Sequence, residues 1–351
     1  MAKSSIIGLD IGTTHVRAAE LEFSGGTPGR GHGTLIKYAQ IPLPEGAVRD
    51  LEVVEKSTVG AAIRKLWLQG GFGHKKVNVG IGNQRVFVRE LDLPWMPIKD
   101  LKQALPYQAA DIIPMSVEEA LLDFYPTAES EGPNGRTLHG MLVAAVRGAV
   151  SSNVLAANAG GLNIGIVDLN AFALLRALTQ GELKNRTAAV IDIGAKATNI
   201  VISENGLPAL VRILPIGGQD FTTAVANVLE TSAGEGDRIK LEIGFGYSVA
   251  PELQGAADAI ADIGRNLADA IRSTLAFYTS TNTNKSIDLI TLTGGGSLLP
   301  GFGQFLSTSS RIAVAVGNPL ETLKISRSAA SSIAGNEAFA STAIGLAYGV
   351  A

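Results

Sequence analysis

The chain has 351 residues, of which 46% are apolar and 17% charged, and its formal net charge is −3. This composition is too apolar for a disordered chain, and the net charge provides no basic field that would hold nucleic acid. The sequence contains no cysteine, which excludes disulfides, thiolate zinc sites and thiol catalysis.

The first part of the chain predicts a hairpin followed by a third strand. Apolar residues 6–9 lead into the motif Asp-Ile-Gly-Thr-Thr at residues 10–14, and strand-like patterns follow at 16–21 and 35–39. The glycine pair at 25–26 predicts the turn that separates the last two strands. At about 150 residues per domain, the length allows two such units or one two-lobed domain.

A helix over residues 59–67 comes next, with a cap at Ser57-Thr58 and a stop at Gly70-Gly71. The region that follows changes pattern and predicts a small inserted subdomain. The elements predicted there are, in order, a strand at 86–93, a helical region interrupted at Pro106, and strands at 120–126 and 141–146 joined by a polar turn at 129–135.

The second half of the chain repeats the beginning of the first. Residues 191–198 resemble residues 9–16, so Asp192 corresponds to Asp10 at an offset of 182 residues. Strand patterns, a glycine-containing turn and a further strand follow in both halves. The other elements predicted in this half are a helix at 168–178 after a strand at 164–167, a helix at 260–278 and a strand at 289–292. Strands that alternate with helices favour an α/β fold built from two related halves.

The ends of the chain carry no targeting signal that we can identify. The apolar run before Asp10 is too short for a signal peptide, and no stretch approaches about 18 uncharged apolar residues. Residues 343–351 predict a helix end packed on the core rather than a membrane-surface helix, which would need a basic face. We therefore expect a cytoplasmic protein with no direct membrane insertion.

The Asp-Ile-Gly-Thr-Thr motif has the chemistry of a phosphate-binding turn. Gly12 allows a sharp turn, Thr13 and Thr14 offer hydroxyls and amides to anionic oxygens, and Asp10 can hold Mg²⁺ through waters. Alone, the motif is also compatible with a glycine-stabilised hairpin that the aspartate caps. Its duplicate at Asp192 and Gly194 favours two hairpins that clamp a polyphosphate between two lobes.

Four further segments indicate a nucleotide site only when they are considered together with the two hairpin motifs. The three glycines at 294–296 fit either a close approach to a ligand or a tight strand-to-helix turn. Residues 237–240 predict a charged helix start, and the glycine pair at 217–218 predicts a turn before a helix that begins at Phe221. Asp168 fits an N-cap, and it could also orient a water toward a phosphate.

The four histidines are scattered in the sequence, at positions 15, 32, 74 and 139. None pairs at metal-ligand spacing, which argues against histidine metal sites and against Ser-His-Asp chemistry.

The order of these motifs resembles the actin-like nucleotide-binding superfamily, which includes actin, sugar kinases, the heat-shock chaperone ATPases, MreB and FtsA. Residues 237–240 resemble its ribose and adenine contact segment. The five segments that resemble its phosphate, connecting-helix and adenosine motifs are 10–16, 168–173, 192–198, 294–296 and 341–347.

The inserted segment is similar to the PilM family of type IV pilus assembly proteins. It contains Leu-Pro-Trp-Met-Pro at 93–97, a helical stretch that reaches Ile-Ile-Pro at 112–114, and Leu-Asp-Phe at 122–124. Two positions depart from the wider superfamily. Lys196 stands where small residues are usual, and Asp168 stands where many relatives have Glu. Both departures favour nucleotide binding over fast hydrolysis.

The resemblance implies an actin-like, ribonuclease H-like duplicated α/β fold with two lobes and an FtsA-type inserted subdomain. The implied parts are a first lobe at 1–80 and 150–186, an insert at 81–149, a second lobe at 187–335 that includes an adenine-binding subdomain, and a C-terminal helix at 336–351 that returns to the first lobe.

The resemblance also implies ATP or ADP with Mg²⁺ in the interlobe cleft. The residues expected to be catalytic are Asp10, Asp168 and Asp192. Of these, Asp10 and Asp192 are also expected to bind the metal. The residues expected to bind nucleotide are Gly12, Thr13, Thr14, Gly194, Lys196, Thr198, Gly217, Gly218, Asp237, Lys240, Gly294, Gly295 and Gly296.

The implied partner is the cytoplasmic N-terminal peptide of PilN and, through it, the PilN/PilO inner-membrane platform. The pilus motor ATPases and self-association are further candidates. Two alternatives remain open. One is an FtsA-like division protein, although this chain shows no amphipathic C-terminal membrane helix. The other is an actin-fold small-molecule kinase, because Asp-Ile-Gly-Thr-Thr also opens sugar kinases.

Overall fold

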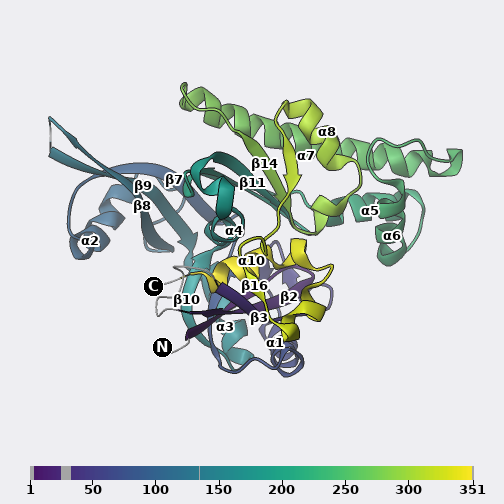
Figure 1. Cartoon of the computed structure of the whole chain (residues 1–351), viewed down its shortest axis with the longest axis horizontal. Helices are drawn as coiled ribbons and strands as arrows, with labels where there is room; N and C mark the ends of the chain where they lie inside the picture. Colours follow the sequence, from purple (N-terminus) through teal and green to yellow (C-terminus); the bar gives the residue numbers. More distant parts are fainter. Residues whose placement is uncertain (1–3, 25–32, 134, 350–351) are drawn as a thin grey trace.

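The computed structural model describes residues 4–24, 33–133 and 135–349, and two large sheets dominate it (Figure 1). The expected glycine turn at 25–26 lies outside these residues. The first sheet has six strands, which lie in the spatial order β10 (Asn163–Leu169), β6 (Lys76–Ile81), β1 (Ser4–Ile11), β2 (His15–Phe23), β3 (Gly33–Pro42) and β16 (Lys324–Ile325).

The second sheet repeats this order. Its five strands lie in the order β15 (Val314–Val316), β14 (Leu289–Thr293), β11 (Thr187–Ile193), β12 (Thr198–Glu204) and β13 (Leu207–Leu214). In each sheet the first strand pairs antiparallel with the second and parallel with a strand that comes later in the chain. The two-fold repetition predicted from the sequence is therefore present in the strand order itself.

Helices cover both faces of the first sheet. Side chains alternate along β1, so Ile7 and Leu9 join the core under α1 while Gly8 faces the other way. A Cβ built on Gly8 would lie 2.1 Å from the Ala343 carbonyl oxygen, so only glycine lets the last helix pack this closely. The helices around this sheet are α1 (Lys56–Gly70), α3 (Arg147–Ala159), α4 (Asn170–Leu178), α9 (Arg327–Ile333) and α10 (Glu337–Ala347).

The second lobe carries the long helix expected over residues 260–278. Its apolar face, at three- and four-residue spacing, is buried against the second sheet, and full burial of such side chains contributes about 1.5–3 kcal/mol each. The helices of this lobe are α5 (Gly218–Val228), α6 (Ala233–Ile243), α7 (Gln254–Thr281) and α8 (Phe302–Ser310). In Figure 1 they lie on the far side of the second sheet from α4 and α10.

The insert forms a separate three-stranded sheet with one helix. Its strands lie in the order β7 (Val86–Pro94), β9 (Gly135–Val146) and β8 (Ala120–Gly132), and α2 (Ile98–Ala109) covers one face. The β8–β9 hairpin projects as an arm at the upper left of Figure 1. The predicted polar turn at 129–135 is wrong in extent, because cross-strand pairing continues to Gly132 and Gly135.

Three other local expectations differ from the structure. The cap of α1 is at Glu55 rather than at Ser57-Thr58, although the helix stops where expected, with Gly71 at φ 61°. The helix α5 begins at Gly218, before Phe221, because the Asp220 carboxylate accepts a hydrogen bond from the Gly217 N–H at 2.8 Å. The segment 237–240 lies in the middle of α6, because Ser232 caps that helix.

The second-lobe boundary expected at residue 335 also differs. The strand β16 pairs in parallel with β3, with Lys324 opposite Thr34 and Ile325 opposite Leu35. The Ser326 hydroxyl caps α9 and donates to the Ile36 carbonyl at 3.1 Å. Residues 324–333 therefore belong with the first sheet, and the chain crosses back before the last helix begins.

Candidate functional site

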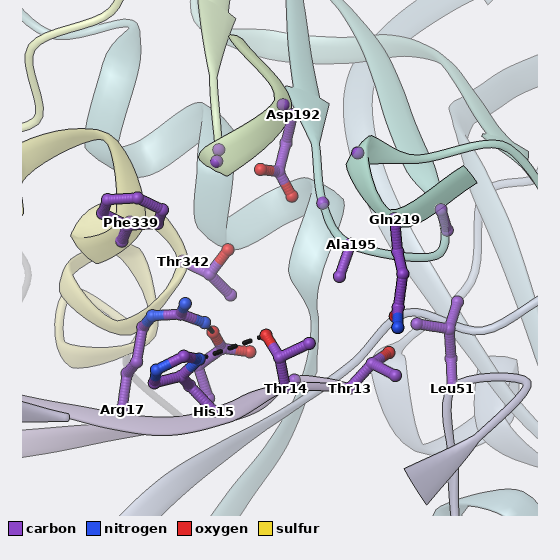
Figure 2. Close-up of a pocket in the computed structure, with 18 of the residues that line it drawn as sticks. Thr13, Thr14, His15, Arg17, Leu51, Asp192, Ala195, Gln219, Phe339 and Thr342 are labelled. Atoms are coloured by element: carbon purple, nitrogen blue, oxygen red, sulfur yellow. Dashed lines mark hydrogen bonds and ion pairs between the residues drawn. The ribbon is translucent and has the colours of Figure 1, made fainter. Parts of the chain in front are cut away.

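A cavity of about 510 Å³ lies where the β1–β2 hairpin faces the β11–β12 hairpin. Figure 2 shows the first hairpin along one side, with Thr13, Thr14 and Arg17, and Asp192 approaching from the opposite side. The predicted site residues that line it are Asp10, Gly12, Thr13, Thr14, Asp192, Gly194, Gly218, Asp237, Lys240, Gly294, Gly295 and Gly296.

The two hairpins have the same internal geometry. The Gly12 N–H donates to the His15 carbonyl at 3.0 Å, and the Gly194 N–H donates to the Ala197 carbonyl at 2.9 Å. This bond closes each turn and leaves the remaining loop groups directed at the cavity. The local fold thus follows from a glycine at the same place in both copies.

Each hairpin also holds its aspartate against a cross-strand partner. Asp10 lies opposite Arg17 in the ladder, and the Arg17 guanidinium is 3.7 Å from its Oδ2. Asp192 lies opposite Asn199, whose Nδ2 donates to Asp192 Oδ2 at 3.2 Å. The first copy therefore presents a carboxylate with a cation, and the second a carboxylate with a neutral amide.

The two carboxyls are hard to ionise in the absence of a cation. Burial raises the pKa of Asp192 to about 6, the Asn199 hydrogen bond opposes the rise, and the charge of Asp10 adds to it. Burial also raises the pKa of Asp10, against the opposing effect of Arg17. Two carboxyls that repel each other across a cavity fit a divalent cation between them, and Mg²⁺ would retain part of its water shell there.

The glycine-rich turn at 294–296 packs on the second hairpin. A Cβ on Gly294, whose φ is 81°, would lie 2.4 Å from Asp192 Oδ1, and one on Gly296 would lie 2.2 Å from Ile193 Cγ2. The glycines at these two positions are therefore required by the protein's own packing. From the sequence, these glycines fitted either a close approach to a ligand or a tight strand-to-helix turn. In the structure they form a tight turn, and this turn also lines the cavity.

Another part of the cavity wall belongs to α6. The Lys240 ammonium is buried and donates to Asp237 Oδ1 at 2.6 Å and to the Thr222 hydroxyl at 2.9 Å. Its donation to the Gly218 carbonyl at 3.4 Å ties α6 to the start of α5. This part of the wall is thus fixed and polar, and the Gly218 N–H in turn donates to the Gly194 carbonyl of the second hairpin at 2.8 Å.

Four of the predicted site residues do not line the cavity. Thr198 is fully buried and its hydroxyl donates to the Ile216 carbonyl at 2.7 Å. Lys196 points at Asp220, 3.4 Å away, and Gly217 packs against the Ala195 carbonyl. In all three cases a nearby backbone or carboxylate group within the second lobe takes the polar contact that we assigned to phosphate.

The fourth is Asp168, and its predicted role of orienting a water is the main correction. Its carboxylate forms an ion pair with Arg176 of α4 and accepts a hydrogen bond from the Leu169 N–H at 2.7 Å. The N-cap interpretation is also wrong, because α4 begins at Asn170 without a side-chain cap. It is Asn170, two residues later, that lines the cavity.

Several lining residues were missed from the sequence: Arg17, Asn153, Asn170, Asn199, Gln219, Phe339 and Thr342. Arg17 could have been recognised from the sequence, because a hairpin closed at Gly12 places it directly across from Asp10. Its guanidinium also stacks over the Phe339 ring of α10, with 5.5 Å to the centroid. The asparagines carried no such signal, since a lone Asn in a strand or helix is a common surface residue.

Three residues that line this cavity each carry a buried polar atom that has no hydrogen-bond partner within the described part of the chain. The atoms are Thr13 Oγ1, Asn170 Oδ1 and Asn199 Oδ1. A buried oxygen without a partner costs about 1–3 kcal/mol, so such atoms mark places where a ligand or its waters complete the bonding. One donor-acceptor hydroxyl and two acceptors beside two carboxyls fit a polyphosphate with a hydrated cation.

The cation would have few protein ligands. Among the described residues, no group of three or more His, Asp or Glu side chains is arranged to hold a metal ion. A site with Asp10 and Asp192 alone suits Mg²⁺, which is usually bound through one or two carboxylates, waters and substrate phosphates.

One arrangement contradicts an argument made from the sequence. Asp92, His139 and Ser130 come together on the insert, with His139 Nδ1 2.7 Å from Asp92 Oδ1 and His139 Nε2 2.7 Å from Ser130 Oγ. Sequence spacing could not reveal a triad formed across three strands. Ser130 and His139 lie on the β8–β9 arm and Asp92 on the neighbouring strand β7, and none of the three lines the interlobe cavity.

Comparison with protein families gives a match over almost the whole chain. The family model described as type IV pilus assembly protein PilM matches residues 8–349. A chain in the structure of a PilM-PilN type IV pilus biogenesis complex is 27% identical, with a TM-score of 0.84 over 97% of both chains.

More distant structures share the fold alone. EutJ from Carboxydothermus hydrogenoformans is 14% identical, with a TM-score of 0.57 over 99% of this chain and 90% of that one. MreB 5 of Spiroplasma citri bound to AMPPNP is 11% identical, with a TM-score of 0.53 over 97% and 94%. These neighbours confirm the predicted actin-like α/β fold.

Curated relatives by sequence are cell division proteins FtsA. The Bacillus subtilis (strain 168) protein is 22% identical over 268 residues, which cover 69% of this chain and 58% of the relative. The Borreliella burgdorferi protein is 22% identical over 359 residues, 91% of this chain and 86% of the relative. No helix within residues 4–24, 33–133 and 135–349 is long and apolar enough to cross a membrane.

Proposed function

The chain belongs to the PilM family of type IV pilus assembly proteins, and we propose that it is an ATP-binding scaffold of the pilus assembly platform. ATP or ADP with Mg²⁺ would occupy the cavity between the hairpins. Asp10 and Asp192 would hold the hydrated cation, and Thr13, Thr14 and Arg17 would bind phosphate oxygens. The observation that carries this proposal is the pair of matched hairpins that line one cavity. Residues of both hairpins also carry polar atoms that lack a hydrogen-bond partner among the described residues.

The nucleotide would act as a bridge between the lobes. Each hairpin belongs to a different sheet, so a ligand that binds both holds the sheets at one separation. A ligand shifts a conformational equilibrium only by its differential affinity for the two states. Closure of the two lobes would therefore follow from contacts of the phosphates and the cation with both hairpins. ATP binding would be sufficient for this closure, and hydrolysis could be slow.

The partner we propose is the cytoplasmic N-terminal peptide of PilN, and the PilN/PilO inner-membrane platform through it. This proposal is supported by the likeness to the chain in the PilM-PilN complex. We propose that the docking region lies between the first lobe and the insert, next to the buried apolar cluster of Ile81, Ala145 and Val150, whose side chains pack against one another in the core. The protein would be cytoplasmic and reach the membrane through this partner. The pilus motor ATPases and a second copy of the chain are further candidate partners.

Calorimetric titration of the full chain with Mg-ATP tests the site. We expect saturable binding that requires Mg²⁺ and that Asp10→Ala weakens by at least tenfold. The matched control is Asp262→Ala, an exposed aspartate on α7 that pairs with Arg265. Equal affinity in Asp10→Ala and wild type would refute the assignment of the cavity.

A pull-down with the N-terminal PilN peptide, with and without Mg-ATP, tests the scaffold role. We expect the peptide to retain the protein more strongly with nucleotide. Retention by an N-terminal peptide of a division protein instead would favour the second candidate, an FtsA-like function, which the similarity to FtsA proteins supports. Membership of the PilM family over residues 8–349 argues against a small-molecule kinase.

A further inference from the structure

The insert carries a cluster of three side chains that the proposed function does not use. Ser130, His139 and Asp92 form a chain of contacts across the three strands of its sheet. We propose that Ser130 is an activated nucleophile that takes the acyl group from small carboxylic esters, with His139 as its general base and Asp92 as the positioning residue. This activity is separate from nucleotide binding, since none of the three residues lines the interlobe cavity.

Strand pairing places the three residues on one face of the sheet. Asp92 of β7 lies directly opposite His139 of β9 in the antiparallel ladder. His139 lies opposite Ala128 of β8, and Ser130 is the next residue of β8 on the same face. Diagonal neighbours of this kind are within reach of a long side chain such as histidine.

An irregularity in β8 decides which residue reaches the histidine. The register shifts just before Ala128, so that Thr127 is an extra residue on this strand. The Thr127 hydroxyl donates to the His139 carbonyl at 3.3 Å. Without the extra residue, the side chain diagonal to His139 would be Glu129 rather than Ser130, because a shift of one residue exchanges the faces of a strand. The bulge therefore brings a hydroxyl to the imidazole.

The atoms that make contact are the ones that activate a serine. His139 Nδ1 is 2.7 Å from Asp92 Oδ1, and His139 Nε2 is 2.7 Å from Ser130 Oγ. A carboxylate only accepts hydrogen bonds, so in the neutral ring Nδ1 carries the proton. Nε2 then has the lone pair that accepts the Ser130 hydroxyl proton, and Asp92 stabilises the imidazolium that results.

A second cluster of the same residue types, in the first lobe, lacks this order. Ser5 Oγ donates to Glu20 Oε1 at 2.9 Å and lies 3.1 Å from His74 Nε2. His74 Nε2 is also 3.9 Å from the same Glu20 oxygen. The carboxylate there binds the serine hydroxyl itself and faces the same ring nitrogen as the serine. Ser5 therefore provides a matched control for Ser130.

The cluster is open to solvent, and this sets the class of substrate. Ser130 is exposed, and 34% of the His139 side chain is exposed. The β8–β9 arm that carries both residues projects from the body of the molecule (Figure 1). An electrophile can therefore reach Ser130 Oγ directly from solvent. Small esters with a good leaving group fit such an open site, because they need the least stabilisation by surrounding hydrogen-bond donors.

The reaction has two steps, and the ester and water are its reactants. In the first step, Ser130 Oγ bonds to the ester carbonyl carbon, its proton passes to His139 Nε2, and the leaving group departs with the electron pair of the broken C–O bond and with that proton. In the second step, a water oxygen bonds to the same carbon and a water proton passes through Nε2 to Ser130 Oγ. The bond between Ser130 and the acyl group breaks, and the carboxylic acid leaves.

A fluorophosphonate probe tests the nucleophile, because it phosphonylates activated serines in preference to ordinary hydroxyls. The full-length chain is incubated with the probe, and the labelled residue is identified by peptide mass mapping. We expect labelling at Ser130 in wild type and, at the same rate, in the control Ser5→Ala. This labelling should be absent from Ser130→Ala. It should be at least about 100-fold slower in His139→Ala, at the lower end of what a general base contributes.

Turnover of p-nitrophenyl acetate tests the role of Asp92. We expect a burst of p-nitrophenol, an acetyl group on Ser130 and a slower steady release, as for any acyl-enzyme. Asp92→Asn should lower kcat roughly tenfold with KM unchanged, a modest loss because 66% of the Asp92 side chain is exposed and its charge is screened. Asp92→Glu should recover part of kcat, because it restores the charge.

Two results would overturn the inference. One is a wild-type chain whose Ser130 is labelled no faster than that of the chain unfolded in urea. The other is equal labelling of Ser130 in wild type and in His139→Ala. Circular dichroism shows whether this variant folds, and His139→Gln, which retains a polar side chain but takes no proton, replaces it if it does not. Mg-ATP binding by Ser130→Ala should equal that of wild type, so either result leaves the proposed function intact.

Discussion

Arg17 and Asn199 stand at equivalent places in the two hairpins, and the difference between them sets the charge of the site. Arg17 brings a guanidinium beside Asp10, whereas Asn199 leaves Asp192 with a neutral partner. The two hairpins are therefore asymmetric, because a cation stands beside the carboxylate of the first hairpin and a neutral amide beside that of the second. An anionic ligand would place its densest negative charge toward Arg17, because a guanidinium presents several donors to phosphate oxygens.

Replacement of Arg17 tests this asymmetry. We expect Arg17→Ala to weaken Mg-ATP binding by about 10- to 100-fold, since a charge-assisted hydrogen bond contributes about 1.5–3 kcal/mol. Arg17→Lys should recover only part of the affinity, because a lysine lacks the bidentate geometry. Calorimetry measures both, with exposed Arg265→Ala as the control. Unchanged affinity in Arg17→Ala would show that the phosphates lie elsewhere in the cavity.

The raised pKa of Asp192 gives a second test at this scale. Its folded-state pKa of about 6 exceeds the ordinary value of 3.8, so the folded chain holds the extra proton between these pH values. Stability of the ligand-free protein should fall as pH rises through this window, with the full cost present above pH 6.

Asp192→Asn should therefore stabilise the ligand-free protein by roughly 1–2 kcal/mol at pH 7.5 and by nothing measurable at pH 3.8 or below. This free-energy gain is smaller than the full pKa shift of Asp192 would give, because solvent in the cavity screens the charge. Urea unfolding at the two pH values measures the difference. A gain that is the same at both pH values would indicate a packing effect instead of removal of a buried charge.

At the scale of elements, the packing of α10 on α4 connects the site to the core. A Cβ on Gly345 would lie 1.8 Å from the Ala173 carbonyl oxygen, so the two helix backbones touch there. We expect Gly345→Ala to cost about 3 kcal/mol or more, because relief requires a helix to move. The control is Gly148→Ala on α3, where no atom lies within 4 Å, and it should gain up to about 1 kcal/mol. Equal thermal stability of the two variants would contradict this packing.

The elements that the sequence predicted well are those whose signal is local. The hairpin motifs lie within single stretches of chain, so Gly12, Asp10 and their copies could be assigned to the cavity before the structure. Asp168 and Asn170 could not be told apart, because the choice depends on Arg176 and on two glycines at the end of β6, Gly80 and Gly82. Pairings between distant segments, such as β16 with β3, leave no periodic pattern in a two-residue strand.

At the scale of the whole molecule, the two lobes meet through a shared core. This core joins side chains of the first sheet, of α4 and α10, of the second sheet and of the insert. The insert also lies close to the second lobe. Burial raises the pKa of Glu90 in β7, the charge of Glu204 adds to this rise, and the charge of Lys285 opposes it. Motion of one lobe relative to the other must therefore be accommodated at α4 and α10, which lie between the sheets (Figure 1).

A ligand that bridges the hairpins should couple segments that are far apart in sequence. We expect Mg-ATP to slow amide hydrogen exchange in residues 10–17 and 192–199 together, because both turns become bonded to one ligand. In Asp10→Asn, protection should be lost from both segments, although the second is intact. Asp262→Asn, on the surface of α7, should behave as wild type. If 192–199 keeps its protection in Asp10→Asn, the nucleotide binds the second lobe alone and lobe closure does not depend on it.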